Sequence, residues 1–283
     1  MKACILYKKE NENKVRCLAC AHKCLIDNNK TGICNIRKNI NGKLYLLVYG
    51  KIAAMHIDPI EKKPLYHFLP NTKTFSIGTI GCNFKCDFCQ NFDISQKSKI
   101  FGKDYTPEQI VNEAIKTGCK SIAYTYNEPI IFSEFAHDTA EIAKQKGLKN
   151  IMVTNGYWSI ESFNFLKDLI DAVNIDLKGN NKYYQKFCKA KLSPVLETIK
   201  RCHEHGIHIE LTTLLIPDEN DSDKDIEDIA KFIASINKDI HWHISRFFPM
   251  YKMINKPMTQ KESLEKAYKI GKKYLNYVYL GNV

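Results

Sequence analysis

Short apolar runs alternate with amphipathic segments from about residue 75 onward. Six of these runs are rich in β-branched and aromatic residues and predict strands at 75–80, 121–126, 150–155, 172–177, 208–215 and 241–248. Several are almost continuously hydrophobic, as parallel strands are when both faces of their sheet are covered. Since a helical stretch separates successive runs, the pattern predicts an α/β fold. It has five or six β-then-α units around a parallel sheet that is open or rolled into a barrel.

Signals for helix starts lie between the predicted strands. Residues 106–109, Thr-Pro-Glu-Gln, combine a capping residue, a proline at the first helical position and a capping-box glutamine. Residues 259–262, Thr-Gln-Lys-Glu, predict a second capping box, and Ser193-Pro194 opens a further helix. After the polar loop 218–223, apolar residues recur at helical spacing as far as Ile236.

The first 70 residues follow a different pattern. They hold a group of closely spaced cysteines, an Asn41-Gly42 hairpin turn between two apolar runs, and a basic, proline-containing segment at 57–70. We therefore expect two units: a small cysteine-rich metal module with its connector over residues 1–70, and a core over residues 71–283.

Composition narrows the class of protein. The chain has 283 residues, of which 44% are hydrophobic and 26% charged, and it contains no run of 18 uncharged apolar residues. Its first residues do not resemble a signal peptide, so we expect a cytoplasmic protein without membrane association. The net charge is +11, but only four of the 42 basic residues are arginine, the usual reader of bases and phosphates. The charge therefore gives little support to a nucleic-acid partner.

Seven of the eleven cysteines fall in two tight groups. In a reducing compartment such groups are typical of metal ligands rather than of disulfides. The second group, Cys82, Cys86 and Cys89, follows the first predicted core strand with the spacing C-x3-C-x2-C. Zinc would require a distant fourth ligand such as His56 or His67, whereas a four-iron cluster with three thiolates keeps one iron open. The position at the carboxyl end of a strand, where parallel α/β folds bind ligands, favours the cluster.

These residues carry a resemblance to a known family. C-x3-C-x-aromatic-C, with Phe88 as the aromatic residue, resembles the signature of radical S-adenosylmethionine (SAM) enzymes. The resemblance implies a partial (β/α)6 TIM-type barrel in which SAM chelates the fourth iron of a [4Fe-4S] cluster. The reduced cluster then cleaves SAM to methionine and a 5′-deoxyadenosyl radical, which abstracts hydrogen from a substrate.

Further residues at predicted strand ends agree with the resemblance. Glu128, in Tyr-Asn-Glu-Pro where the family has Gly-Gly-Glu-Pro, would accept from the SAM amino group. Because Tyr126 and Asn127 replace the two glycines, the sequence does not determine the backbone conformation just before Glu128. Residues that would bind the SAM carboxylate and ribose, or complete the pocket, are Thr154, Asn155, Asp176, Lys178 and Thr213. His243 and Arg246 are candidates on the substrate side.

The first cysteine group forms a complete ligand set. Its spacing is C-x2-C-x3-C-x9-C, from Cys17, Cys20, Cys24 and Cys34, and His22 could replace one of these cysteines. Four thiolates suit either structural zinc or an auxiliary iron–sulfur cluster, and the sequence does not separate the two. We expect a closed structural site.

The whole chain resembles the radical SAM member of the AmmeMemoRadiSam system, a group related to pyruvate formate-lyase activating enzymes. The motifs are RCLACAHKC, IDPIEKKPLYHFLP, YTYNEP, VTNGY, NIDLKG and TTLLIP. The resemblance implies an electron donor such as flavodoxin or ferredoxin, a small-molecule or protein substrate, and Memo-type and AMMECR-type partners. Chains of this group often continue beyond the equivalent of Val283 with a cysteine-containing tail, and this sequence departs from them there. The alternatives are a glycyl-radical enzyme activase and an RNA-modifying radical SAM protein.

Overall fold

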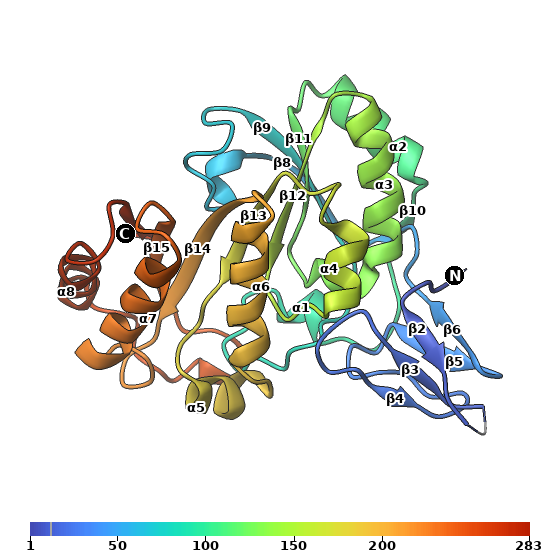
Figure 1. Ribbon diagram of the computed structural model, residues 1–283, viewed down its shortest axis with the longest axis horizontal. Coiled ribbons are helices and arrows are strands. Elements are labelled where there is room, and N and C mark those ends of the chain that lie inside the picture. Colours follow the sequence, from blue (N-terminus) through green and yellow to red (C-terminus); the bar gives the residue numbers. More distant parts are fainter. Residues whose placement is uncertain (12) are drawn as a thin grey trace.

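The computed structural model describes residues 1–11 and 13–283, and its centre is one eight-stranded sheet (Figure 1). The strand order is β16-β15-β14-β13-β12-β11-β9-β8. In this sheet, β9 and the strands on its far side from β8 all run parallel. β8 pairs antiparallel with β9 at one edge. The parallel strands are β9 (Lys73–Gly78), β11 (Ser121–Tyr124), β12 (Lys149–Thr154), β13 (Ala172–Asp176), β14 (His208–Leu215), β15 (His241–Arg246) and β16 (Val278–Gly281). The predicted α/β fold with a parallel sheet is confirmed.

Two strands extend the sheet beyond the six that the sequence predicts. β16 adds a parallel strand beside β15, and β8 (Ala54–Pro59) pairs with β9 from Ala54 opposite Gly78 to Pro59 opposite Lys73. β8 belongs to the first 70 residues and yet is part of the large sheet. The expected division of the chain near residue 70 stays a prediction.

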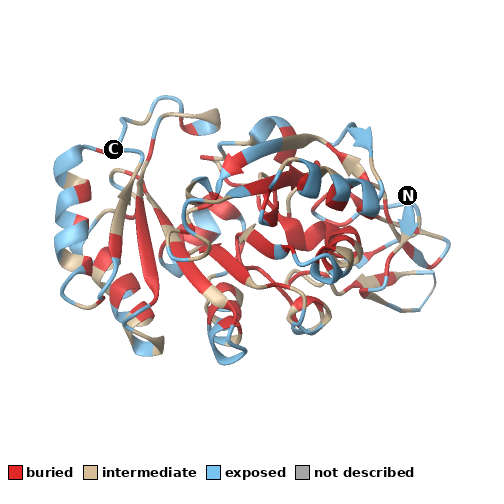
Figure 2. Cartoon of the chain, turned by 90° about the horizontal axis from the view of Figure 1, so that it is seen from above, coloured by how far each residue is buried: buried red, intermediate tan, exposed pale blue. Residues whose placement is uncertain are grey.

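Helices connect the strands, and their outer faces are exposed while the strands are buried (Figure 2). The long helices are α2 (Pro107–Lys116), α3 (Ser133–Gln145), α4 (Ile160–Leu166), α6 (Ser193–Glu204), α7 (Asp223–Ile236) and α8 (Lys261–Gly271). The short ones are η1 (Ile60–Lys62), α1 (Phe92–Ser95), η2 (Pro129–Phe132), α5 (Asn181–Tyr183), η3 (Tyr184–Cys188) and η4 (Tyr251–Met253). No described helix combines the length and apolar character that a bilayer-spanning segment needs.

One predicted capping box is confirmed and the other is wrong. Before α2, the Gln109 backbone N–H donates to the Thr106 hydroxyl, and the Thr106 N–H donates to the Gln109 side chain. Before α8 the cap is Gln260, which makes no side-chain cap bond. The Thr259 hydroxyl instead donates to the Leu215 carbonyl and accepts from the Phe247 N–H, because the ends of β14 and β15 offer it partners before the helix does.

The amino-terminal segment forms two small sheets. One has the order β1 (Lys2–Ala3), β6 (Lys43–Leu46), β5 (Arg37–Ile40), and the other has β2 (Tyr7–Lys9), β3 (Val15–Cys17), β4 (Leu25–Ile26). A separate pair joins β7 (Lys51–Ile52) to β10 (Lys103–Asp104). The hairpin between β5 and β6 turns at Asn41 and Gly42, both with positive φ, as a two-residue type I′ turn requires.

A buried ion pair joins this segment to the barrel. Arg37 donates to both carboxylate oxygens of Glu134 on α3, and its Nε donates to the Ile131 carbonyl. The backbone N–H groups of Ile5 and Leu6 donate to the same carboxylate. Both charged side chains are 1% exposed. The amino-terminal sheets are therefore fixed against α3, which packs on β11 and β12.

Candidate cofactor site

The cysteine loop leaves the carboxyl end of β9. Cys86 and Phe88 are buried, and Cys82 and Cys89 are half-buried. The loop begins at Gly81, whose φ is +86° and where an added Cβ would lie 2.5 Å from the Cys34 carbonyl oxygen. Only glycine permits this approach, so the loop with the second cysteine group runs directly against the segment that carries the first.

A turn far along the chain supports the cysteine loop. The Lys85 and Asp87 N–H groups donate to the Cys188 and Phe187 carbonyls, each at 3.1 Å. These carbonyls belong to η3, a single π-helical turn, and such turns are frequent at functional sites. The buried Cys188 thiol lies against Cys86, a contact that no spacing in the sequence indicates. Burial and this neighbouring thiol raise the pKa of Cys86 well above its usual value.

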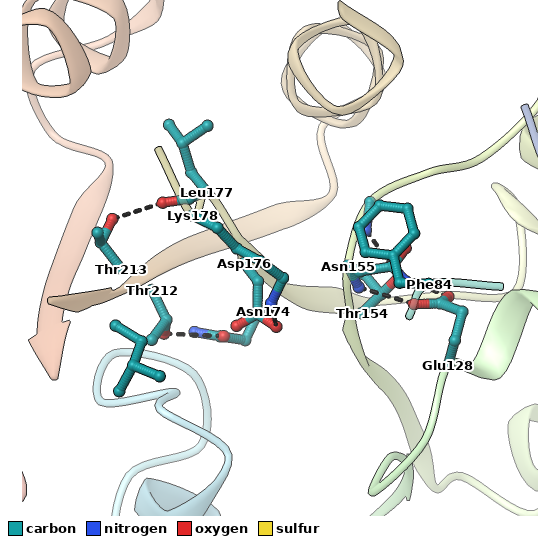
Figure 3. A network of polar contacts seen from close by, with 12 residues as sticks. Phe84, Glu128, Thr154, Asn155, Asn174, Asp176, Leu177, Lys178, Thr212 and Thr213 are labelled. Atoms are coloured by element: carbon teal, nitrogen blue, oxygen red, sulfur yellow. Dashed lines mark hydrogen bonds and ion pairs between the residues drawn. The ribbon is translucent and has the colours of Figure 1, made fainter. Parts of the chain in front are cut away.

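Glu128 is a buried carboxylate surrounded by neutral donors. Its Oε1 accepts from the Ile130 N–H and the Thr154 hydroxyl, at 3.0 and 2.7 Å, and its Oε2 accepts from the Asn155 N–H at 2.7 Å. Figure 3 shows Glu128 directed toward Thr154 and Asn155 at the end of β12. Burial raises the pKa of Glu128 to about 7, in spite of these hydrogen bonds. The carboxylate lies near Cys82 and is suited to receive a cation.

The two residues before Glu128 show how the strand end is built without the glycines. Tyr126 has φ +68°, the left-handed conformation that glycine adopts without strain. Its carbonyl accepts from the Asn91 side chain, and its hydroxyl donates to Asp58. The Asn127 side chain donates to the Ile80 and Gly81 carbonyls and so fixes the start of the cysteine loop.

Asp176 and Lys178 form a second polar group at the end of β13 (Figure 3). The Lys178 ammonium donates to Asp176 at 2.6 Å and lies 5.7 Å from the centre of the Phe88 ring. Burial disfavours the ammonium, but Asp176 and the nearby Cys86 outweigh burial and raise the pKa of Lys178 above its usual range. The end of β13 thus faces the cysteine loop with a fixed positive charge.

Three other predicted residues make structural contacts in β14 and β15, and Thr213 among them contacts the end of β13. The Thr213 hydroxyl donates to the Leu177 carbonyl and accepts from the Trp242 indole, at 2.7 and 2.9 Å. His243 lies 2.6 Å from Glu210, and Arg246 donates to the Thr259 carbonyl at 2.8 Å. Their roles toward SAM or substrate stay predictions.

Asn83, between the first two cysteines, is a site residue that the sequence reading missed. Its Oδ1 accepts from the Asn155 side chain at 2.8 Å, and its Nδ2 is buried without a hydrogen-bond partner among the described residues. A buried amide donor without a partner is costly, so this one is suited to an acceptor on a bound ligand.

The comparison with known families decides the class of this site. The profile described as "Radical SAM superfamily" matches residues 76–233, more than half of the chain. The chain belongs to the radical SAM superfamily. An uncharacterized protein of Methanocaldococcus jannaschii, MJ0808, is 45% identical over the whole of this chain and 86% of its own length. A putative glycyl-radical enzyme activating enzyme of the same organism, MJ1227, is 28% identical over 76% of this chain and 91% of its own length.

A solved structure shows the same fold. The crystal structure of a domain of pyruvate-formate lyase-activating enzyme from Bacteroides vulgatus superposes with a TM-score of 0.50 at 22% identity, over 57% of this chain and 99% of that domain. Membership of the radical SAM superfamily, together with the activating-enzyme relatives, makes this chain an enzyme, and its family uses a [4Fe-4S] cluster and SAM.

The residues present fit both cofactors of a radical SAM enzyme. Three cysteines on one loop supply thiolates, and burial raises the pKa of each, so iron rather than the protein would stabilise the thiolate form. Among the residues that the structure describes, the Glu128 carboxylate has no cationic hydrogen-bond donor and the Asn83 amide nitrogen has no acceptor. An amino acid moiety carries the complementary groups, an ammonium and a carboxylate.

The first cysteine group adjoins the same loop. Burial raises the pKa of Cys17, Cys20, Cys24 and Cys34, and for Cys20 the other three thiols raise it further. The His22 Nε2 lies 2.9 Å from the Asn83 carbonyl, next to Cys82. The choice between zinc and an auxiliary cluster at these cysteines stays a prediction.

The two distant histidines named for a zinc site at the second group lie elsewhere. His56 lies on β8 and packs against Tyr126. His67 stacks on His241, the first residue of β15.

Proposed function

We propose that Cys82, Cys86 and Cys89 hold the [4Fe-4S] cluster and that Glu128 receives the SAM ammonium. When bound, the cluster and SAM supply reductive cleavage to methionine and a 5′-deoxyadenosyl radical, which takes hydrogen from a small-molecule or protein substrate. An external one-electron donor such as flavodoxin or ferredoxin is required for the reduction.

One observation carries this proposal: a buried carboxylate near the cysteine loop whose donors are all neutral. Glu128 is 2% exposed, and burial alone would push it toward the neutral acid. Thr154 and Asn155 hold it in place, and Asn155 in turn positions the Asn83 amide. The ammonium of a bound amino acid would pair with the Glu128 carboxylate, and its carboxylate would accept from the Asn83 amide.

Asp176 and Lys178 support the same placement of SAM. The ion pair lies at the end of β13, next in the sheet to the strand that ends at Thr154. Lys178 is 9% exposed and close to Cys86 and Phe88, so its charge faces the cofactors rather than bulk water. We propose that this lysine favours a SAM carboxylate or a ribose oxygen and that Asp176 orients it.

The experiment uses protein reconstituted anaerobically with iron and sulfide, then reduced with dithionite in the presence of SAM. We expect about four irons at the core site, since a cubane cluster contains four, and release of 5′-deoxyadenosine, measured by liquid chromatography and mass spectrometry. Cys86→Ala should abolish the release. Cys202→Ala, which removes a buried thiol from α6, is the matched control and should retain it. Equal release from Cys86→Ala would refute the assignment of the loop.

For the substrate, we propose an enzyme of the AmmeMemoRadiSam type, with Memo-type and AMMECR-type partners. The motifs RCLACAHKC and IDPIEKKPLYHFLP support this proposal, because they lie in the amino-terminal segment and resemble that group. Co-purification with a Memo-type protein would support the proposal. Transfer of deuterium from a labelled candidate substrate into 5′-deoxyadenosine would identify the hydrogen donor.

A glycyl-radical enzyme activase is the second candidate, favoured by the activating-enzyme relative MJ1227. That alignment leaves about a quarter of this chain uncovered. The two candidates separate by the product: an activase leaves a stable glycyl radical on a large partner protein, visible by electron paramagnetic resonance, whereas action on a small molecule leaves none.

A further inference from the structure

A group of histidines and one glutamate lies near the opposite end of the sheet from the cysteine loop. His208 and Glu210 are the first and third residues of β14, and His241 and His243 are the first and third of β15. The two strands are parallel, with Glu210 opposite His241. The cysteine loop follows the carboxyl end of β9, whereas these residues lie at the amino ends of their strands. His208, Glu210 and His241 therefore lie away from the cysteine loop.

The side chains of this group share one face of the sheet. Residues two apart on a strand point the same way, and Trp242, between the two histidines, points toward α8, where a Cβ on Gly271 would lie 2.9 Å from its ring. His241 and His243 therefore point away from that helix. Their face is covered by the 66–67 segment, whose Tyr66 and His67 rings pack on His243 and His241.

Three side chains of the group have the spacing of metal ligands. One ligand atom each from His208, Glu210 and His241 lies within 4.8 Å of the other two. The His208 Nε2 is 3.1 Å from a Glu210 oxygen. Neighbouring ligands of a tetrahedral zinc ion, with bonds of about 2.0–2.1 Å, lie roughly 3.3 Å apart, so a metal would fit where these two atoms now share a proton.

His241 supplies an independent indication of a ligand. Its Nδ1 is buried and has no hydrogen-bond partner among the described residues, and the residue is 9% exposed. A neutral imidazole keeps a lone pair on one ring nitrogen, which is the atom that binds a metal. A buried imidazole nitrogen without a partner costs free energy that a metal bond would recover.

The carboxylate is oriented by neighbours outside the ligand set. The Tyr66 and His67 N–H groups donate to the two oxygens of Glu210, at 3.0 and 2.8 Å, and His243 lies 2.6 Å from it. Metal sites in proteins depend on such outer contacts, which fix the ligand and its charge.

We infer that His208, Glu210 and His241 bind a first-row transition-metal dication such as Zn²⁺. Two imidazoles and a carboxylate suit these ions better than they suit Mg²⁺ or Ca²⁺, which prefer all-oxygen shells. A surface hollow of about 270 Å³ adjoins the group, lined by both histidines together with His203, Asn237 and Asp239. It gives the ion a route of access and leaves room for a fourth ligand from solvent.

The test measures metal binding by the full-length chain and does not depend on SAM cleavage. Protein with both cysteine groups loaded is treated with a mild chelator and then dialysed anaerobically against micromolar Zn²⁺ or Co²⁺. We expect one further equivalent, and Co²⁺ bound there should show weak visible bands without thiolate charge transfer. His241→Ala and His208→Ala should each weaken this binding on the order of 100-fold, as loss of a ligand or of its supporting contacts does.

His203→Ala is the matched control, because His203 is exposed, lines the same hollow and lies outside the three-residue group. It should bind the further equivalent normally. His208 lies at the rim of the hollow, so His208→Ala remains informative if His241→Ala does not fold. The inference is overturned if wild-type protein binds no further equivalent, if that equivalent survives both substitutions, or if Co²⁺ shows only thiolate bands. If wild-type protein binds no further equivalent, the three side chains serve only to hydrogen-bond one another.

Discussion

The raised pKa of Glu128 makes a quantitative prediction about stability. The unfolded chain titrates this carboxyl near its ordinary value of 4.5, and burial raises the pKa in the folded protein to about 7. Between these two values the folded state holds the proton and the unfolded state has lost it. The free energy of unfolding therefore falls as the pH rises from 4.5 to about 7, and the whole penalty is present above that range.

The size of the effect follows from the gap between the two pKa values. Each pH unit is worth about 1.4 kcal/mol, so the penalty at pH 8 comes to about 3 kcal/mol. Glu128→Gln removes the titrating group. Its amide nitrogen would face one of the donors that the carboxylate accepts from, either the Asn155 N–H or those of Ile130 and Thr154. That loss costs about 1–3 kcal/mol at every pH.

The measurement is therefore a difference of pH profiles rather than a single stability. Urea unfolding of wild type and Glu128→Gln, followed by circular dichroism with thiols reduced and SAM omitted, is compared between pH 5 and pH 8. Contributions of all other groups cancel in the difference. We expect the variant to gain about 2.5 kcal/mol relative to wild type across this range, because part of the penalty is already present at pH 5. Parallel profiles would show that Glu128 is ionised in the folded protein at pH 5, and the reasoning from burial would be wrong.

Two further substitutions, each with a matched control, test the packing around the site. Arg37→Met leaves Glu134 buried without its partner and should lower the free energy of unfolding in urea by about 3–5 kcal/mol. Lys2→Met removes a half-exposed pair with Asp138 and should lower it by less than about 1 kcal/mol. Equal losses would contradict the argument from burial. Gly156→Ala places a Cβ 2.7 Å from Ile175 at φ +70° and should cost about 1–3 kcal/mol more than Gly206→Ala, where φ is +75° but the space is open. Similar melting temperatures for the two alanine variants would show that the clash relaxes at no cost.

The sequence predicts most of the barrel because buried parallel strands leave a strong local signal. All six apolar runs are strands, with ends shifted by a few residues. β8 was missed because its residues are mostly half-buried or exposed and include His56, Asp58 and Pro59, so it lacks the hydrophobic run. β16 was missed because it is only four residues long and mostly half-buried. An edge strand is defined by its partner, which a local pattern does not contain.

For the candidate site, the order of the strands predicts which strand ends lie side by side, while the roles of the residues there stay predictions. Glu128, Asp176 and Lys178 converge because the carboxyl ends of neighbouring parallel strands meet at one edge of the sheet. Thr213 differs from its neighbour Thr212 by one residue, which places the two side chains on opposite faces. The contact between Cys86 and Cys188 joins segments about a hundred residues apart, and no spacing rule announces it.

The amino-terminal segment packs directly against the cysteine loop and helps to position it. The segment contacts the loop at two points, where Gly81 passes the Cys34 carbonyl and where His22 meets the Asn83 carbonyl. A third contact is the hydrogen bond from Ser159, just beyond the end of β12, to the Leu18 carbonyl. We predict a metal at the first cysteine group, and its loss would loosen the loops that carry these four cysteines, because short cysteine-rich modules depend on their metal. The Asn83 amide and the cysteine loop would then lose the surface that positions them, so occupancy of the first cysteine group is expected to control the second.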